Sequence, residues 1–210
     1  MSSATITTSA RLMNSTPQTE EQAMVRKVAV SSFLGNFIEW FDYASYSYFA
    51  TTIALVFFPT DNHTVAMLQT FGVFALSFIL RPIGALFWGS YGDKKGRKAA
   101  LAHSIMFMSG ASFLIGCLPS YSVIGVGAPI LLLLLRMVQG FSASGEYAGA
   151  ATFLGEYAPT SKRGIYCSLI PASTAIGLLA GSTLATLMTA NMNSSAMGGW
   201  GWRVPFLLAG

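Results

Sequence analysis

Long apolar segments separated by short polar turns are the feature that most limits how this chain can fold. Five complete segments are followed by a sixth that begins at Trp202 and reaches Gly210, and the five lie near 28–58, 65–88, 99–118, 128–157 and 165–190. A helix needs about 20 apolar residues to cross the hydrocarbon core of a bilayer. With 53% hydrophobic and only 10% charged residues, the chain is too apolar for a soluble domain of 210 residues. The sequence therefore predicts an all-helical, multi-pass membrane protein.

Lysine and arginine residues lie on one side of the predicted bundle. They occur near the N-terminus and in the turns at 89–98 and 158–164, whereas the turns at 59–64 and 119–127 contain neither. Short basic loops stay on the cytoplasmic side of a membrane. We therefore expect a cytoplasmic N-terminus in a multi-pass chain of the plasma membrane. Trp202, at the start of the sixth segment, is expected to lie at the outer membrane boundary, where indole rings are enriched.

The start of the chain differs in character from the rest. Residues 1–24 are mostly polar and rich in Ser and Thr, which predicts a disordered cytoplasmic tail, and residues 25–210 are expected to form the transmembrane helix bundle. The net charge of +4 comes from cations in short turns beside spans. Insertion topology explains such cations, so the expected surrounding partner is membrane lipid and no nucleic-acid partner is expected.

Ionisable residues inside the predicted spans are candidates for function, because an unpaired charge in a membrane is costly. At about 1.5 Å per residue, Glu39 and Asp42 lie about 16 and 21 Å from the inner end of the first span, and Arg136 lies about 12 Å from the outer end of the fourth. These depths predict that Arg136 pairs at the level of Glu39 and Asp42. By the same count, Arg81 is expected to pair with Glu146, nearer the cytoplasm.

Two interpretations of these charges remain open. The ions can neutralise one another and fix the register of the helices, or a carboxylate beside an arginine can take up and release a proton as access to water alternates. For Arg81 we favour the structural role, because it precedes Pro82 and can brace a kink. Residues three or four apart share a helix face, so Tyr46 joins the same face of the first span. The predicted substrate and proton pathway consists of Glu39, Asp42, Tyr46, Arg136, Gln139 and Glu146.

The residues that usually support catalysis are not grouped in this sequence. His63 and His103 have no Cys or carboxylate cluster at metal-ligand spacing. No nucleophile is accompanied by a base, and no glycine-rich loop follows a strand and ends in the lysine and hydroxyl of a phosphate loop. We therefore expect no enzymatic activity, no catalytic residue, no metal site and no cofactor.

Two motifs resemble those of the major facilitator superfamily. One is GSYGDKKGRK at 89–98, which is similar to the signature loop of that superfamily, and the other is RMVQG at 136–140, which is similar to its fourth-helix motif. A narrower resemblance, to the metabolite:proton symporters, comes from GNFIEWFDY at 35–43, GEYAGA at 145–150 and WGWRVPF at 200–206. Within that group the chain most resembles the proline/betaine carriers.

The resemblance implies a carrier of two six-helix halves that rock around a central site lined by the first and fourth helices. The expected fold of this chain is the N-terminal six-helix half, with the sixth helix truncated. The resemblance also implies that Asp93 braces a helix of the other half and that Arg97 pairs with Glu156 as a latch. The implied gating residues are Gly89, Asp93, Gly96, Arg97, Glu156 and Arg163.

The expected function is proton-coupled import of a small organic metabolite, either a proline/betaine-type osmoprotectant or an organic acid. H⁺ is the expected coupling ion, and the expected partners are the small-molecule substrate and the missing C-terminal half of a carrier of which this chain is a truncated portion. An alternative is a non-transporting truncated membrane protein or assembly partner. A sugar facilitator is less favoured, because it should lack the paired carboxylates Glu39 and Asp42.

Overall fold

The first described helix begins earlier in the chain than the first predicted span. The structure is a computed structural model that describes residues 16–210, with side chains from Val25 onward except at 146–148, 152, 153 and 157. Helix α2 spans Thr16–Tyr48, so the expected tail of residues 1–24 is helical from Thr16 onward, and the prediction of disorder is wrong there. The reason is local, since a proline is tolerated in a first turn and Pro17 is followed by good helix formers over 18–27.

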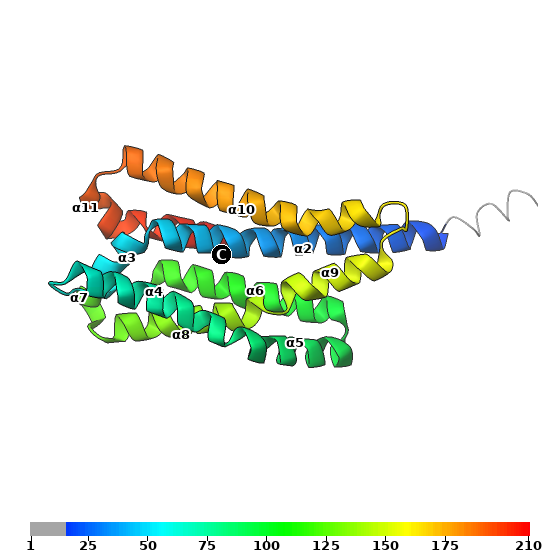
Figure 1. The fold of residues 1–210 in the computed structure, drawn as a ribbon, viewed down its shortest axis with the longest axis horizontal. Coiled ribbons are helices and arrows are strands. Elements are labelled where there is room, and N and C mark those ends of the chain that lie inside the picture. The colour runs from blue at the N-terminus through cyan, green and yellow to red at the C-terminus, as the bar shows by residue number, and fades with distance from the viewer. Residues whose placement is uncertain (1–15) are drawn as a thin grey trace, which may run out of the picture.

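The remaining helices run back and forth along one elongated bundle (Figure 1). Helix α3 continues the first pass along the bundle, and α4 with α5, α6, α8 with α9, and α10 form the next four passes. The short elements α7, α11 and the π-helical turn η1 are connections at one end. Their bounds are α3 Ala50–Phe57, α4 His63–Ile79, α5 Arg81–Lys95, α6 Arg97–Cys117, α7 Tyr121–Ile124, α8 Gly127–Ala143, α9 Glu146–Tyr157, α10 Arg163–Asn191, α11 Ser194–Ala196, η1 Met197–Gly201 and α12 Arg203–Ala209. Figure 1 shows α12 ending at about half the length of the bundle.

Three helical stretches of the described residues are long and apolar enough to cross a membrane, namely His63–Lys95, Arg97–Cys117 and Arg163–Asn191. The apolar helix α8 is shorter because the fourth pass along the bundle is interrupted between α8 and α9. Another interruption, at Leu80, separates α4 from α5. Pro82 explains it, because a proline lacks the amide hydrogen and its ring clashes with the carbonyl four residues earlier.

Small residues allow the helices to approach closely. A Cβ atom at Gly140 of α8 would overlap the backbone carbonyl of Ser77 of α4. On the other side of the bundle, a Cβ at Gly177 of α10 would lie 2.7 Å from the carbonyl oxygen of Phe37 in α2. Close helix packing of this kind is how membrane helices gain van der Waals contact, since lipid supplies no hydrophobic drive between them.

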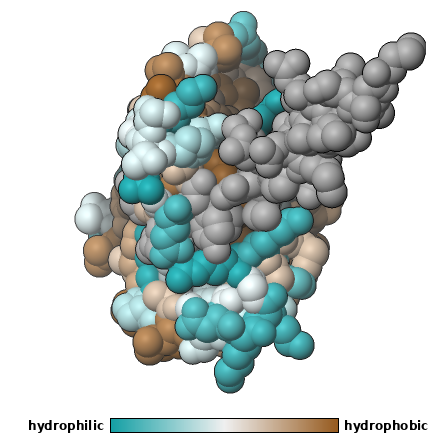
Figure 2. Space-filling model, turned by 90° about the vertical axis from the view of Figure 1, so that its right-hand side faces the viewer, coloured by the Kyte–Doolittle hydropathy of each residue, from teal (hydrophilic) through white to brown (hydrophobic). Residues whose placement is uncertain are grey.

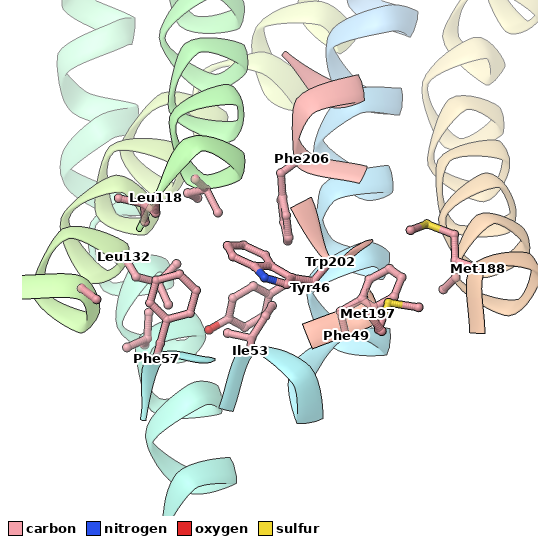
Figure 3. Packing of buried hydrophobic residues seen from close by; sticks show 14 residues of the cluster. Tyr46, Phe49, Ile53, Phe57, Leu118, Leu132, Met188, Met197, Trp202 and Phe206 are labelled. Atoms are coloured by element: carbon pink, nitrogen blue, oxygen red, sulfur yellow. The ribbon is translucent and has the colours of Figure 1, made fainter. Parts of the chain in front are cut away.

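A buried aromatic cluster closes the end of the bundle where α3 and η1 meet (Figure 3). The side chain of Trp202 is fully buried, and its ring lies 5.3 Å from that of Phe57 at 81°, an edge-to-face contact. Trp202 therefore packs inside the bundle, and its place at the outer membrane boundary stays a prediction. The indole is buried because the η1 turn directs it into the bundle, between α3 and α12.

Asn36 joins α2 to α10 inside the bundle. Its amide nitrogen donates to the carbonyl oxygen of Ile170 at 3.0 Å and contacts the hydroxyls of Ser173 and Thr174. Asn36→Ala leaves these groups without their partner, so we expect unfolding to become about 1–3 kcal/mol easier. Asn191→Ala is the matched control, because the exposed Asn191 amide donates to the carbonyl of Leu187 in its own helix. Thermal unfolding in detergent measures both, and equal midpoints would contradict the prediction.

Candidate functional site

A buried polar network lies at the centre of the bundle, where α2 passes α6 and α8. The carboxylate of Asp42 accepts a hydrogen bond from Arg136 at 2.5 Å, and the two side chains are only 2% and 1% exposed. Its other oxygen accepts from the Ser112 hydroxyl and the Gln139 amide, each at 3.2 Å. Gln139 also donates to Ser112 at 2.6 Å, so the group forms one connected network. The predicted pairing of Arg136 with the Asp42 level is therefore observed.

The Arg136 guanidinium also rests on aromatic rings. Its carbon lies 3.9 Å above the centre of the Tyr46 ring and 5.5 Å from that of Phe206. The Tyr46 hydroxyl donates to the carbonyl of Thr70 at 2.8 Å, which holds the ring in place. A cation over a ring face gains electrostatic energy that grows as water is excluded. Tyr46 thus supports Arg136 directly through its ring.

The network is incompletely satisfied. Two nitrogens of Arg136, Nε and Nη2, and the amide oxygen Oε1 of Gln139 are buried without a hydrogen-bond partner among the described residues. Buried polar atoms without partners raise the free energy of the state that contains them. Loss of the Asp42 charge would leave Arg136 without the carboxylate that pairs with it, so protonation of Asp42 would favour a rearrangement of the network.

Glu39 belongs to a second and separate ion pair. Its carboxylate accepts from Nη2 of Arg81, the first residue of α5, and the same nitrogen contacts the hydroxyl of Tyr43. The partner observed for Arg81 is thus Glu39, and the predicted pair of Arg81 with Glu146 stays a prediction, because the side chain of Glu146 lies outside the described residues. Helix α5 continues to Lys95, beyond the predicted end at 88, so Arg81 lies farther from the inner end than the sequence count placed it.

The two ion pairs differ in their access to solvent. Arg81 is 30% exposed, whereas Arg136 is 1% exposed. Arg81 and Trp40 line two hollows, one of about 650 Å³ between α2, α4 and α10 and one of about 510 Å³ beside Pro82 and Ser144. Glu39 lines the second hollow. The shared helix face predicted for Glu39, Asp42 and Tyr46 is therefore divided between the bundle interior and an open groove.

The residues of the implied gating loop gather at the end of the bundle that carries the α5–α6 turn, and this end surface is largely hydrophilic (Figure 2). Gly89, Asp93 and Arg97 line a cavity of about 260 Å³ there. Gly96 has φ +93°, a conformation that glycine adopts without strain, and its amide closes the end of α5 onto the carbonyl of Gly92.

The implied latch is not formed in this structure. Arg97 and Glu156 are both exposed, and the ion pairs found among the described side chains are Arg136 with Asp42 and Arg81 with Glu39. Arg163 is also exposed, at the first position of α10. The physical reason is solvation, since an exposed ion pair at a bundle end gains little over two hydrated ions.

Sequence reasoning missed three contributors to the site, namely Ser112, Tyr43 and the carbonyl of Thr70. A serine in the middle of the third span was the one available signal, because polar side chains in membrane helices tend to bond across to a neighbouring helix. Tyr43 is the last residue of the GNFIEWFDY motif at 35–43, but it carries no charge. In the part of the chain that the structure describes, no group of three or more His, Cys, Asp or Glu could hold a metal ion.

Comparison with known proteins assigns the chain to a family. Residues 27–210 match the family described as sugar (and other) transporter. The proline/betaine transporter of Salmonella typhimurium is 41% identical over 189 residues, and the glycine betaine/proline/ectoine/pipecolic acid transporter of Dickeya dadantii is 42% identical over 189. Each alignment covers 90% of this chain and 38% of the relative, so the chain spans about two fifths of the length of these curated relatives.

A solved structure has the same fold. The proton:xylose symporter XylE of the major facilitator superfamily, bound to 6-bromo-6-deoxy-D-glucose, aligns with a TM-score of 0.76 at 16% identity, over 90% of this chain and 42% of the symporter. At that identity the likeness concerns the fold alone. The chain therefore belongs to the sugar (and other) transporter family, has the helical membrane fold of the major facilitator superfamily, and corresponds to the N-terminal portion of its relatives.

Proposed function

We propose that this chain is the N-terminal part of a carrier that imports a small zwitterionic metabolite of the proline/betaine type together with a proton. The observation that carries the proposal is the Asp42–Arg136 pair, sealed inside a bundle that is 41% identical to part of a proline/betaine transporter. A charge pair buried in a membrane bundle is costly and is therefore expected to have a function. Transport, rather than catalysis, is the activity that this arrangement supports.

The proposed coupling step is protonation of Asp42. In its charged form Asp42 holds α2 against α8 through Arg136 and Gln139. A proton on Asp42 removes the negative charge and with it most of the attraction to Arg136. Since both side chains are almost fully buried here, proton uptake requires that the bundle first open to water. Proton binding and a change of conformation are then linked, which is what symport needs.

The proposed membrane orientation places the N-terminus in the cytoplasm of a bacterium, with the carrier in the inner membrane. The basic residues Lys94, Lys95 and Lys98 support this, because they belong to the end of α5 and the start of α6. The α5–α6 turn lies at the same end of the bundle as the N-terminal part of α2 (Figure 1). The proposed partner is a C-terminal half that completes the central site. Such an arrangement suits carriers whose halves rock around a site near the membrane midplane.

The test is uptake by a fused carrier. Residues 1–210 are joined to the remaining C-terminal portion of the Salmonella typhimurium relative, and labelled glycine betaine and proline are supplied to proteoliposomes with an acidic exterior. We expect accumulation that collapses when the pH gradient is removed. Absence of uptake by the correctly inserted fusion would overturn the proposal. Residues 1–210 alone form the second arm, in which uptake would contradict the need for a C-terminal half.

Asp42→Asn is expected to separate proton coupling from substrate binding. The amide has the shape of the carboxylate but cannot take up a proton, so the accumulation ratio of betaine should fall to about one, whereas exchange of internal for external betaine continues. Accumulation and exchange are measured in the same vesicles, with Asp61→Asn in the exposed α3–α4 turn as control. Unchanged proton-driven accumulation in Asp42→Asn would rule out Asp42 as the proton site.

A further inference from the structure

The groove around Arg81 has the features of a ligand site. Both hollows of this groove are lined by Arg81 and Trp40, and the larger one is lined also by Tyr43, Phe78, Ser47 and Ser182. A cation, a large aromatic ring and two small hydroxyls therefore face one space of a size that suits a small molecule. The sequence had suggested only a bracing role for Arg81.

The Arg81 guanidinium is held in place, but part of its hydrogen-bonding capacity has no partner among the described residues. The hydrogen bonds found for it among the described residues both come from Nη2, to Glu39 and to Tyr43. Its Nε is buried without a partner among those residues, and its carbon lies 4.6 Å from the centre of the Phe78 ring. A guanidinium has five N–H donors and matches a carboxylate with two parallel bonds. Arg81 therefore has donors left for a second carboxylate.

Trp40 is positioned to supply the complementary surface. Its indole N–H donates to Asn36 at 3.2 Å, which fixes the ring, and its ring centre lies 5.8 Å from that of Tyr43 at 75°. The indole face is the strongest aromatic partner for a cation, and quaternary ammonium groups are recognised in this way. The carboxylate of Glu39 on the same wall of the groove adds negative charge nearby.

We propose that the Arg81 groove is a substrate subsite for a zwitterion, with the substrate carboxylate on Arg81 and its ammonium group against Trp40. The substrate carboxylate takes donors that Glu39 does not occupy, so the Arg81–Glu39 pair serves as a pre-formed anion site. This inference rests on the proposed function and assigns the substrate contacts within it. The sealed Asp42–Arg136 network then responds to the proton, and the open Arg81 groove binds the solute.

The test measures binding to the fused carrier in detergent with three probes. They are glycine betaine, choline, which lacks the carboxylate, and 3,3-dimethylbutanoate, in which carbon replaces the charged nitrogen. Arg81→Lys keeps the charge but loses the paired donors, and we expect it to bind betaine about 10-fold more weakly, with choline unaffected. Betaine binding of wild-type strength in Arg81→Lys would overturn the inference.

A double variant separates ligand contact from folding. Glu39→Gln with Arg81→Gln removes both charges, so no unpaired ion is left in the bundle. A purely structural role predicts that this variant folds and binds betaine normally, whereas the subsite predicts normal thermal stability with betaine affinity reduced about 10- to 100-fold. Restored affinity in the double variant would contradict the subsite.

Trp40 provides an independent check on the ammonium position. Trp40→Phe keeps a ring face and should still prefer betaine over 3,3-dimethylbutanoate, whereas Trp40→Leu should lose that preference by about 3- to 30-fold. An unchanged preference in Trp40→Leu would refute the ammonium assignment. If the wild-type fusion neither binds nor accumulates betaine, the proposed function itself fails. If the wild-type fusion binds betaine and all these variants match it, only the Arg81 subsite fails.

Discussion

Arg136→Gln should be the most damaging single substitution in this chain, lowering the free energy of unfolding by about 3–5 kcal/mol. The glutamine removes the cation that balances Asp42, which is 2% exposed and cannot recruit water. It also leaves the faces of Tyr46 and Phe206 without the guanidinium that rests on them. The measurement is thermal unfolding of the 210-residue chain in detergent, read from the fluorescence of its tryptophans.

The double variant Asp42→Asn with Arg136→Gln tests whether the loss comes from charge. It removes both ions and retains side chains that can form hydrogen bonds, so we expect it to regain much of the lost stability. Lys95→Gln at the exposed end of α5 is the control for loss of a positive charge, and it should leave the midpoint unchanged. Equal destabilisation of the single and double variants would mean that packing, not charge balance, makes Arg136 necessary.

Gly140→Ala is the second large effect we expect. A Cβ atom there would overlap the carbonyl of Ser77, a backbone atom that cannot rotate away, so α4 and α8 must separate. Overpacking of this kind costs about 1–3 kcal/mol or more. Because α8 also carries Arg136 and Gln139, their bonds to Asp42 should weaken as well.

Gly72→Ala is the matched control, because it places the same methyl group on α4 where no atom lies within 4 Å. Alanine is a better helix former than glycine by about 0.5–1 kcal/mol, so this variant should be slightly more stable than the parent chain. The two variants are thus expected to shift the unfolding midpoint in opposite directions. The close contact between α4 and α8 would be unimportant if both shifted it upward.

The pairing of Asp42 with Arg136 could be predicted because depth is a one-dimensional quantity. Each residue adds about 1.5 Å along a helix, so two charges at similar depth in the membrane can be identified by counting. The direction in which a side chain points around its helix also depends on how that helix is rotated against its neighbours. Counting placed Glu39 with Asp42, whereas the structure turns Glu39 towards Arg81 and the groove.

The partner of Arg81 and the surroundings of Trp202 also could not be predicted from the sequence. The start of α5 at Arg81 follows from Pro82, which was visible in the sequence. The partner of Arg81 depends on the length of α5, which continues to Lys95, and on where α2 passes Arg81. The sequence predicted Trp202 at the membrane boundary, but it did not predict that the η1 turn and the ring of Phe57 enclose the indole. An indole side chain suits a lipid boundary or a packed interior, so only packing decides whether it is enclosed.

The sequence by itself determined the class of this protein, because segment length, hydropathy and the positions of basic turns are local properties that add up along the chain. Those properties predicted a helical membrane bundle, and its two motifs pointed to the superfamily that the comparisons confirm. Only the tertiary structure decided that one ion pair is sealed and the other opens onto a groove. The reason is that exposure depends on how neighbouring helices pack around each pair, and residues far apart in the sequence set that packing together.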